Sequence, residues 1–592
     1  MENMNSKFYK QKIRQQSLAK GTFILSLSIF LVKVLGMMFR VFVTGNIGPA
    51  GATCFTLAYE IYNPLFALST AGLPIAVARI VSKNMATGNY RNVKDIYKIT
   101  VPLFTILGIS GTFIMLLAST FVPNIPFINI PDAKYAIAAL SPTILFACLM
   151  SIYRGYHQGL KDVVPTAISE IIEASCKFFI GYIISYLIIK NGKIEFLTKG
   201  TVFGKAFENL DLAMSKGIIP IASAGAIFGV TIGAILGFIY LFLVHKKRGN
   251  VTIEKENIES IKFKIDKKQI LKELLKTALP IGIGSIIFNI SSFIDVTLIL
   301  NRIQHAMKFN PQILLEQYRN VIPESSFNNV HGFLLGCFSF ANPLTMMVPA
   351  VAQCFGTASL PTITRAYVKN NKELLKKSME SVIKMSLSCT APAGIFISIL
   401  GSNLLNIIYP HRPEAVFVAS KIILVLGIGI IFQALSITLS SMLQAIGRMD
   451  LPLKITTTGL IIKIMINYLL VGIPEINIKG AGFSTFFGYL FILVFSFYFL
   501  FKETKVVPDV NNIFFKPITA SCIFGISLTI FKFLFSTFLN NLFTLVFSLT
   551  ISLISYFTLL IYLKIINWKY IKNSKLVKKI LPMFSVFRKN IN

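Results

Sequence analysis

The chain has 592 residues, of which 54% are hydrophobic and only 14% are charged, and its formal net charge is +33 at pH 7. Soluble domains average about 25% charged residues, and a soluble chain of this length would divide into several domains with polar linkers. Here, apolar runs of about 20 residues, enough to cross a membrane as a helix, recur from Gly21 to Ile566. The composition excludes a soluble protein and predicts an all-α membrane protein.

The apolar runs predict about fourteen membrane-spanning helices, because a helix satisfies its own backbone hydrogen bonds and lipid cannot do so. In chain order, the expected spans are 21–45, 54–80, 99–121, 135–154, 165–189, 217–243, 277–301, 333–360, 378–401, 416–441, 452–472, 480–501, 517–538 and 542–566.

The distribution of Lys and Arg predicts the orientation, since cytoplasmic loops carry the excess of these residues. The connection from His245 to Lys276 is rich in them, whereas the connection from Gly45 to Thr53 has none. The first twenty residues are polar and basic and lead into a full-length span without a signal-peptide cleavage pattern. We therefore expect a multi-pass protein of a bacterial-type cell membrane with both termini in the cytoplasm.

Two segments six spans apart resemble each other. QGLKDVVPTAISEIIEASCKFFIGY begins at Gln158, and QAIGRMDLPLKITTTGLIIKIMINY begins at Gln444. Each has Gln, then Lys nineteen residues on (Lys177, Lys463), then Tyr at twenty-four. Gly72-Leu73-Pro74 and Ser359-Leu360-Pro361 give a second match at the same offset. The repeat predicts two parallel six-helix lobes related by a pseudo-two-fold axis, plus two C-terminal helices, as in transporters with alternating access.

This organisation gives six expected parts. They are a cytoplasmic N-terminal segment (1–20), an N-lobe (21–243), a cytoplasmic inter-lobe loop (244–276), a C-lobe (277–501), the last two spans (502–566) and a basic cytoplasmic tail (567–592).

Ionisable residues inside spans are costly in lipid and usually face an interior cavity. Lys33, Gly36 and Arg40 have the spacing i, i+3, i+7 and share one face of the first span. We interpret this as a cationic face lining a cavity. The alternative is that Arg40 reaches the outer headgroups or pairs with Glu60 of the second span.

The fifth and eleventh spans carry the repeat lysines. Glu170, Glu173 and Lys177 again have the spacing i, i+3, i+7, and an internal Glu173–Lys177 ion pair is one interpretation. Lys463 has no acidic neighbour on its own helix, which favours a cavity-facing position. Asp295 of the seventh span is either a counter-ion to Arg40 or Lys33, or a site for a coupling cation or proton.

The inferred cavity is therefore cationic with a few carboxylates, which suits an anionic substrate. The sequence contains no phosphate-binding GxxxxGK[ST] loop, and its five histidines have no HExxH or CxxC companion. We expect no enzyme activity, no cofactor, no metal site and no nucleic-acid partner.

The stretch KGTFILSLSIFLVKVLGMMFR, then IGPAG and YEIYNPLFALSTAGLPIAVARIVSKNMATGN, resembles the polysaccharide-biosynthesis (oligosaccharide flippase) family that includes stage V sporulation protein B. FIDVTLI in the seventh span and LPTITRAY at the end of the eighth fit the same pattern. This family belongs to the multidrug/oligosaccharidyl-lipid/polysaccharide exporter superfamily, and the lipid II flippases are more distant relatives.

The resemblance implies a flippase for a polyprenyl-pyrophosphate-linked saccharide, most often a peptidoglycan precursor, with membrane lipid and cell-wall synthesis proteins as partners. It implies substrate contacts by Lys33 and Arg40, although Arg40 is one position later than in the lipid II flippase motif and Val41 replaces its acidic residue. Two other functions stay open, a cation-coupled multidrug exporter of the same superfamily and a non-transporting scaffold for cell-wall synthesis.

Overall fold

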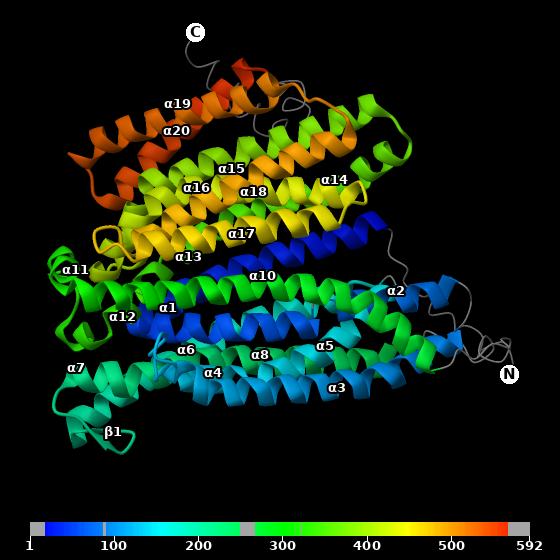
Figure 1. The fold of residues 1–592 in the computed structure, drawn as a ribbon. Helices are drawn as coiled ribbons and strands as arrows, with labels where there is room; N and C mark the ends of the chain where they lie inside the picture. The colour runs from blue at the N-terminus through cyan, green and yellow to red at the C-terminus, as the bar shows by residue number, and fades with distance from the viewer. Residues whose placement is uncertain are drawn as a thin grey trace, which may run out of the picture. The chain divides into compact units, whose positions relative to one another are not determined.

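The computed structural model describes residues 18–70, 72–86, 90–160, 162–248, 267–319 and 321–565. These residues form helices with one short hairpin of two strands (Figure 1). The elements before α10 are α1 Leu18–Thr70, α2 Leu73–Ala86, α3 Tyr90–Phe121, η1 Val122–Asn124, α4 Ala133–Leu140, α5 Pro142–Gly159, α6 Val164–Lys199, β1 Thr201–Val202, β2 Lys205–Ala206, α7 Leu210–Leu212, the π-helix η2 Ala213–Ile218 and α8 Ile219–Arg248.

The remaining elements are α10 Lys267–Phe309, α11 Pro311–Gln317, η3 Glu324–Asn329, α12 Val330–Ser339, α13 Asn342–Thr345, α14 Met347–Val368, α15 Lys372–Ile408, α16 Pro413–Ala445, α17 Asp450–Val471, α18 Lys479–Thr504, the π-helix η4 Asn511–Phe515, α19 Lys516–Ser536 and α20 Asn541–Tyr562.

The helix α1 contains the first two predicted spans, folded back on each other. Its helical geometry is interrupted at Gly48, which has φ 68° and ψ −173° and is followed by Pro49. The rings of Phe39 and Phe55 lie 5.9 Å apart, centroid to centroid, whereas these residues would be about 24 Å apart on a straight helix. The chain therefore reverses at Gly48, where a side chain would disfavour the left-handed backbone, and the two arms appear in blue in Figure 1.

Two predicted spans are interrupted. The second span, predicted at 54–80, is divided because α1 ends at Thr70 and α2 begins at Leu73. A side chain at Gly72 would overlap the carbonyl group of Ala278 on α10, so this glycine permits a close backbone approach. The eighth span, predicted at 333–360, is divided among α12, α13 and α14 around Pro343, since proline lacks the amide hydrogen that a continuous helix needs.

Within the described residues, twelve helices are long and apolar enough to cross a membrane, and α1 counts among them as one helix from Leu31 to Ala67. Dividing α1 at Gly48 and adding α10, which covers the predicted seventh span, gives fourteen segments. The all-helical membrane fold with about fourteen spans is thus confirmed. Large apolar side chains on α3, such as Ile106 and Phe113, are exposed, as a lipid-facing surface requires.

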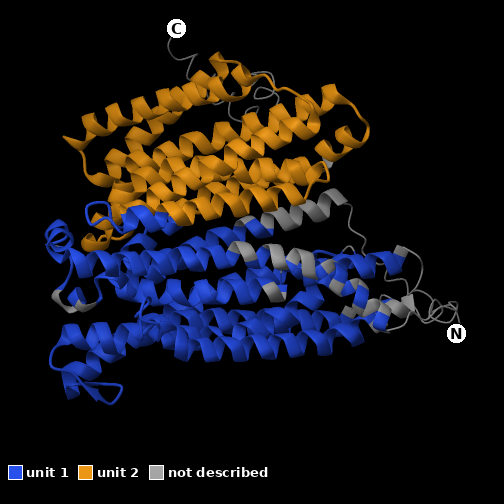
Figure 2. Ribbon diagram, in the orientation of Figure 1, with its two compact units in different colours: residues 1–343, 467–478 blue, residues 344–466, 479–592 orange. Residues whose placement is uncertain are grey.

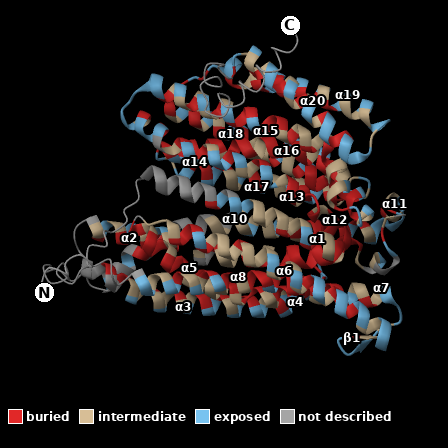
Figure 3. Ribbon diagram, turned by 180° about the vertical axis from the view of Figure 1, so that it is seen from behind, coloured by how far each residue is buried: buried red, intermediate tan, exposed pale blue. Residues whose placement is uncertain are grey.

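The chain divides into two compact units (Figure 2). Unit 1 contains the described residues up to Pro343 together with Asn467–Ile478, and unit 2 contains Leu344–Ile466 and the described residues from Lys479. Buried residues line the inner helix faces of each unit, as Figure 3 shows. The lobe boundary at 244–276 rests on the sequence repeat, not on compactness, and stays a prediction.

Unit 1 is held together by α1, which packs against α6, α8, α10 and α12. The hydroxyl of Thr53 donates a hydrogen bond to the Gly332 carbonyl oxygen at 2.5 Å. The hydroxyls of Thr56 and Ser339 lie 2.9 Å apart. Small and hydroxylated residues therefore let α1 and α12 approach closely, as is common between membrane helices.

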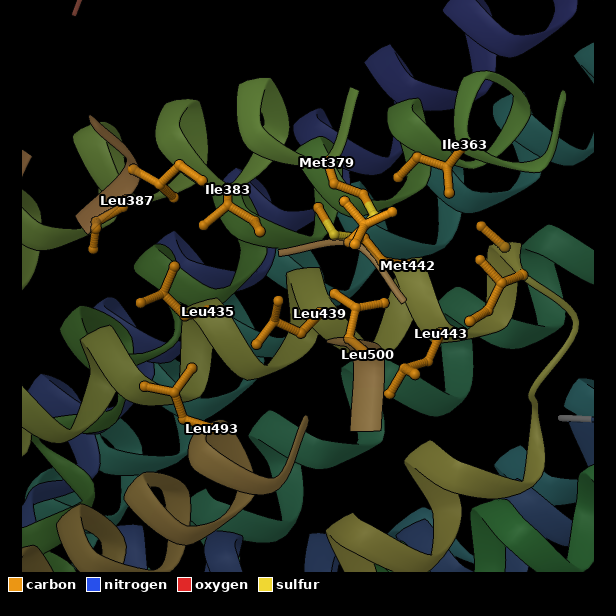
Figure 4. Close-up of a cluster of buried hydrophobic side chains, with 14 of the residues drawn as sticks. Ile363, Met379, Ile383, Leu387, Leu435, Leu439, Met442, Leu443, Leu493 and Leu500 are labelled. Carbon is orange, nitrogen blue, oxygen red and sulfur yellow. The ribbon is translucent and has the colours of Figure 1, made fainter. Parts of the chain in front are cut away.

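Unit 2 has an aliphatic core contributed by α14, α15, α16 and α18 (Figure 4). Ile363, Ile383, Leu439, Met442 and Leu500 are at most 1% exposed within it. The C-terminal helices α19 and α20 pack on each other and on α15 around a second apolar cluster that includes Phe524 and Tyr556.

Candidate functional site

Two predicted cationic residues lie on one group of aromatic rings in unit 1, which we call the cation–aromatic cluster: Phe39, Arg40, Phe55, Tyr59 and Lys177. The Lys177 Nζ atom lies 4.9 Å from the Phe39 ring centroid and 5.1 Å from that of Tyr59. The Arg40 Cζ atom lies 5.9 Å from the Phe55 centroid. Phe55 contacts the rings of both Phe39 and Tyr59, at 5.9 and 4.8 Å.

The cluster forms because three helical segments meet there. The reversal at Gly48 brings Phe39 beside Phe55. The helix α6 then packs closely on α1, since a side chain at Gly181 would lie 2.9 Å from Phe39 Cε2. Asn46 fixes the two helices by donating a hydrogen bond from its Nδ2 atom to Ser185 Oγ at 3.0 Å.

Of the two interpretations of the fifth span, the ion pair between Glu173 and Lys177 is not found among the described residues. Glu173 Oε2 instead accepts a hydrogen bond from Arg154 Nη2 of α5 at 3.0 Å. Arg154 Nε also donates to Ser169 Oγ at 3.1 Å. Because the guanidinium group has five donors in a fixed plane, it can contact both residues on α6 at once, and Glu173 serves as its counter-ion.

Lys177 is consequently left on aromatic faces. Among the described residues, no carboxylate lies within ion-pair distance of its ammonium group. A cation over an aromatic face is stabilised by about 0.5–2 kcal/mol, which is less than the cost of breaking a buried ion pair. Lys177 can therefore transfer to an anionic ligand at a small loss.

Lys33 lies on the first arm of α1, as predicted, and its side chain is exposed. Gly36, one turn further on, has no atom within 4 Å of the position that a Cβ atom would occupy. The predicted face thus has open space between Lys33 and Arg40. Glu60 lies next to Tyr59 on the second arm and is half-buried, and its role as a counter-ion stays a prediction.

Asp295 on α10 contacts Asn467 at the end of α17. The Asn467 Nδ2 atom donates a hydrogen bond of 2.6 Å to Asp295 Oδ1. Asn467 is fully buried, and no described residue contributes a hydrogen bond to its Oδ1 atom. A carboxylate and a buried amide oxygen therefore lie close together, and both are ligands for hard cations.

Lys463 belongs to unit 2 and is half-buried. Its aliphatic part lies against α18, because a Cβ atom at Gly488 would be 2.7 Å from Lys463 Cβ. In unit 1, α6 has a similar relation to α8, where a Cβ atom at Gly233 would be 3.4 Å from the Lys177 backbone nitrogen. Each repeat lysine therefore lies on a helix that packs closely on the next span through a glycine.

Sequence reasoning missed the aromatic partners Phe39 and Tyr59. Their positions depend on the reversal at Gly48, which places residues on separate arms in contact. The signal was present in the Gly48-Pro49 pair and in the ring spacing of Phe55, Tyr59 and Tyr62, but spacing alone does not show which cation the rings contact.

No group of three or more His, Cys, Asp or Glu residues in the described part of the chain has metal-binding geometry.

Solved structures show the same fold. An inward-facing multidrug resistance MATE family transporter of the MOP superfamily is 14% identical, with a TM-score of 0.61, and covers 81% of this chain and 98% of its own. The lipid II flippase MurJ in an inward closed conformation is 16% identical, with a TM-score of 0.55, and covers 91% of this chain and 98% of its own. The molecule is thus a multi-pass membrane protein with a transporter fold.

The family model described as polysaccharide biosynthesis protein matches residues 18–203 and 213–367. Because the match covers more than half of the chain, this protein belongs to the polysaccharide biosynthesis protein family, which confirms the resemblance found in its sequence. A second model, described as MatE, matches residues 314–469.

Two curated relatives come from Bacillus subtilis (strain 168). The lipid II flippase MurJ is 23% identical over 489 residues, which are 81% of this chain and 82% of the relative. Stage V sporulation protein B is 20% identical over 480 residues, which are 81% of this chain and 82% of the relative. The similarity therefore extends over most of each protein and places flippase and sporulation proteins among the homologues.

Proposed function

We propose that this protein is a flippase that moves a polyprenyl-pyrophosphate-linked saccharide, a peptidoglycan precursor of the lipid II type, across the cell membrane by alternating access. Both termini and the 244–276 loop would lie in the cytoplasm. The observation that carries the proposal is the cation–aromatic cluster, in which Lys177 faces two rings instead of a carboxylate. The similarity to a lipid II flippase and to a sporulation protein supports the same substrate class.

The chemistry of the cargo explains why such a cluster is useful. A pyrophosphate is costly to remove from water unless hydrogen bonds replace its hydration. Arg40, Lys33, Lys177 and Lys463 are the proposed substrate-binding residues, and Arg40 can hold two phosphate oxygens with its planar fork. The open space at Gly36 leaves room for the saccharide beside Arg40, while the polyprenyl tail stays in lipid.

The contact between Asp295 and Asn467 is the proposed coupling point. A cation or a proton bound by Asp295 would change the charge of this contact and so the packing of α10 on the end of α17. Glu60 and Glu173 are proposed as counter-ions within unit 1. A charge that moves across 100 mV gains about 2.3 kcal/mol, so either an ion gradient or the membrane potential is sufficient to bias such a cycle.

A flipping assay in defined vesicles tests the proposal. The purified protein would be reconstituted with fluorescent lipid II, and the external pool would be followed by its accessibility to a membrane-impermeant reagent. Replacement of Lys177 by Met should slow flipping about tenfold or more, because a hydrogen bond to a charged group contributes about 1.5–3 kcal/mol. The matched control is Lys190→Met on the exposed end of the same helix, which should flip lipid II at the wild-type rate.

The rival function is a cation-coupled multidrug exporter. The match to the MatE family model and the similarity to a multidrug transporter structure favour this alternative. A cationic cluster repels cationic drugs, so the same vesicles should not transport ethidium. Ethidium transport without lipid II flipping would establish the exporter. A protein inactive toward both substrates, yet co-purifying with cell-wall synthases, would establish the scaffold.

A further inference from the structure

Arg302 on α10 is held in a fixed position by residues far away in the sequence. Its Cζ atom lies 4.3 Å from the ring centroid of Tyr468 on α17. A Cβ atom at Gly472 would overlap the guanidinium group, with Arg302 Nε 2.7 Å and Cζ 2.8 Å away. The guanidinium group therefore lies against the end of α17, over the Tyr468 ring and beside a glycine that leaves room for it.

The same guanidinium group has donors that no described residue uses. Arginine carries five N–H donors and remains charged in proteins. No described residue accepts a hydrogen bond from Arg302 or forms an ion pair with it, and its Nε atom is buried. Asp295, the acidic residue nearest in sequence on α10, is seven residues away, which is about 10 Å along a helix.

The repeat provides a comparison within unit 1. Tyr182 and Tyr468 end the two repeated segments, and each contacts the helix that contains the first span of its own predicted lobe. Tyr182 meets Phe42 of α1 with a centroid separation of 5.8 Å, whereas Tyr468 meets Arg302 of α10. The tyrosine that ends the first repeated segment thus packs on an apolar ring, whereas the tyrosine that ends the second packs on a charged group.

We infer that Arg302, held by Tyr468 and Gly472, is a binding residue for a phosphate group at the outer end of α10. Carboxylate and phosphate groups are the acceptors that match the planar guanidinium group, and no carboxylate among the described residues pairs with Arg302, which leaves phosphate as the acceptor to supply. The site is accessible, since Tyr468 is 47% exposed and Arg302 is half-buried. In the predicted orientation this is the side on which cargo leaves.

Two molecules carry a phosphate group to this place. One is the pyrophosphate of the departing cargo, and this source rests on the proposed function. The other is the headgroup of a phospholipid in the outer leaflet, and it does not depend on that function. Arg302 contacts the phosphate through the same donors in both cases, so binding experiments with the two lipids distinguish them.

Two variants test the site in different ways. In Arg302→Phe the charge is removed, while the ring contact found between Phe42 and Tyr182 is reproduced. In Gly472→Ala every charge is kept and the guanidinium group is displaced by the new Cβ atom. The matched control is Gly482→Ala on α18, where the nearest atom to the new Cβ would be at 3.3 Å, Cγ2 of Ile422.

The measurement is native mass spectrometry in dodecyl maltoside, which carries no phosphate, with undecaprenyl pyrophosphate and phosphatidylglycerol titrated separately. Both site variants should bind one of these lipids about tenfold more weakly, or by about 1.4 kcal/mol, and Gly482→Ala should match the wild type. Selective loss of undecaprenyl pyrophosphate assigns the site to cargo, and selective loss of phosphatidylglycerol assigns it to the leaflet. If neither lipid binds more weakly to Gly472→Ala, whose charge is intact, the inference is overturned.

These outcomes are independent of the flipping assay. A protein that fails to flip lipid II but loses phosphatidylglycerol binding in both variants would refute the proposed function and retain the phosphate site. Conversely, unchanged lipid binding in both variants of an active flippase would leave the function intact and reduce Arg302 to a packing residue.

Discussion

Arg154 on α5 donates a hydrogen bond of 3.0 Å to Glu173 on α6, and this contact determines the surroundings of Lys177. Glu173 lies one helical turn before Lys177 and is the acid that a helix-based ion pair would use. Because Arg154 pairs with that carboxylate, the ammonium group of Lys177 lies over the rings of Phe39 and Tyr59 instead. The pairing thus separates Arg154, which has a carboxylate partner, from Lys177, which has none among the described residues.

The first prediction follows from this separation. Arg154→Met should destabilise the protein by about 1–3 kcal/mol, because it leaves Glu173 with a partly buried and unpaired charge. Lys177→Met should have little effect on stability, since it removes only contacts with aromatic rings. Thermal unfolding in detergent measures both effects.

The double variant Arg154→Met with Glu173→Gln provides the control for that prediction. Removal of both charges should recover most of the lost stability. If Lys177→Met were as destabilising as Arg154→Met, Lys177 would be a structural residue and its place in the substrate site would be lost.

The second prediction concerns the orientation. Single cysteines at Lys193 and Asn328, in a background without other cysteines, should react with an impermeant maleimide added outside intact cells. A cysteine at Lys262, which lies outside the described residues, should react only after the membrane is opened. Labelling of Lys262 in intact cells would reverse the topology.

The third prediction concerns coupling. Asp295→Asn should remove the dependence of flipping on the driving ion while leaving cargo binding near the wild-type value, because it neutralises the carboxylate that contacts Asn467. Flipping rates would be compared in vesicles with imposed sodium and proton gradients. An unchanged response to both gradients would exclude Asp295 from coupling.

The sequence predicts features that depend on local spacing. The reversal between Gly45 and Thr53, the proline in the first turn of α6 and the shared face of Lys33 and Arg40 all follow from short-range patterns. The break before Leu73 was missed because it depends on the approach of α10 to Gly72, and an apolar run does not show where its neighbour lies.

The contacts within the candidate site also depend on residues that are far apart in the sequence. Glu173 and Lys177 are four residues apart on one helix, a spacing that favours an ion pair between them. Glu173 instead pairs with Arg154, which lies nineteen positions before it. The pair of Arg302 and Tyr468 joins residues 166 positions apart, and single-helix periodicity has no information about such contacts. The repeat ends at Tyr468 and Arg302 follows the seventh span, but neither pattern indicates that the two residues meet.

The fourth prediction tests the repeat itself. If Lys177 and Lys463 are related by a pseudo-two-fold axis along the membrane normal, they lie at similar depth. Spin labels at the two positions should then give similar accessibilities to oxygen and to a water-soluble relaxation agent. A depth difference above about 11 Å, two helical turns, would show that the repeated Gln–Lys–Tyr pattern is a coincidence.

The last prediction concerns Arg40, the residue proposed to contact the pyrophosphate. Its guanidinium group lies over Phe55 on the cation–aromatic cluster, on the face where Gly36 leaves open space. Arg40→Ala should abolish flipping and leave the protein at a near-normal level in the membrane. Arg40→Lys should retain part of the activity, because a lysine keeps the charge and loses the planar fork.

A structural role for Arg40 gives the opposite pattern. If Arg40 neutralised Glu60 or Asp295, Arg40→Ala would leave a carboxylate unpaired in the membrane, and the protein would be unstable or absent. Combining Arg40→Ala with Glu60→Ala or Asp295→Ala would then restore the protein level. Flipping and protein level must therefore be measured together in all three variants. Recovery by a double variant would assign Arg40 to the architecture, and normal flipping by Arg40→Ala alone would remove it from the site.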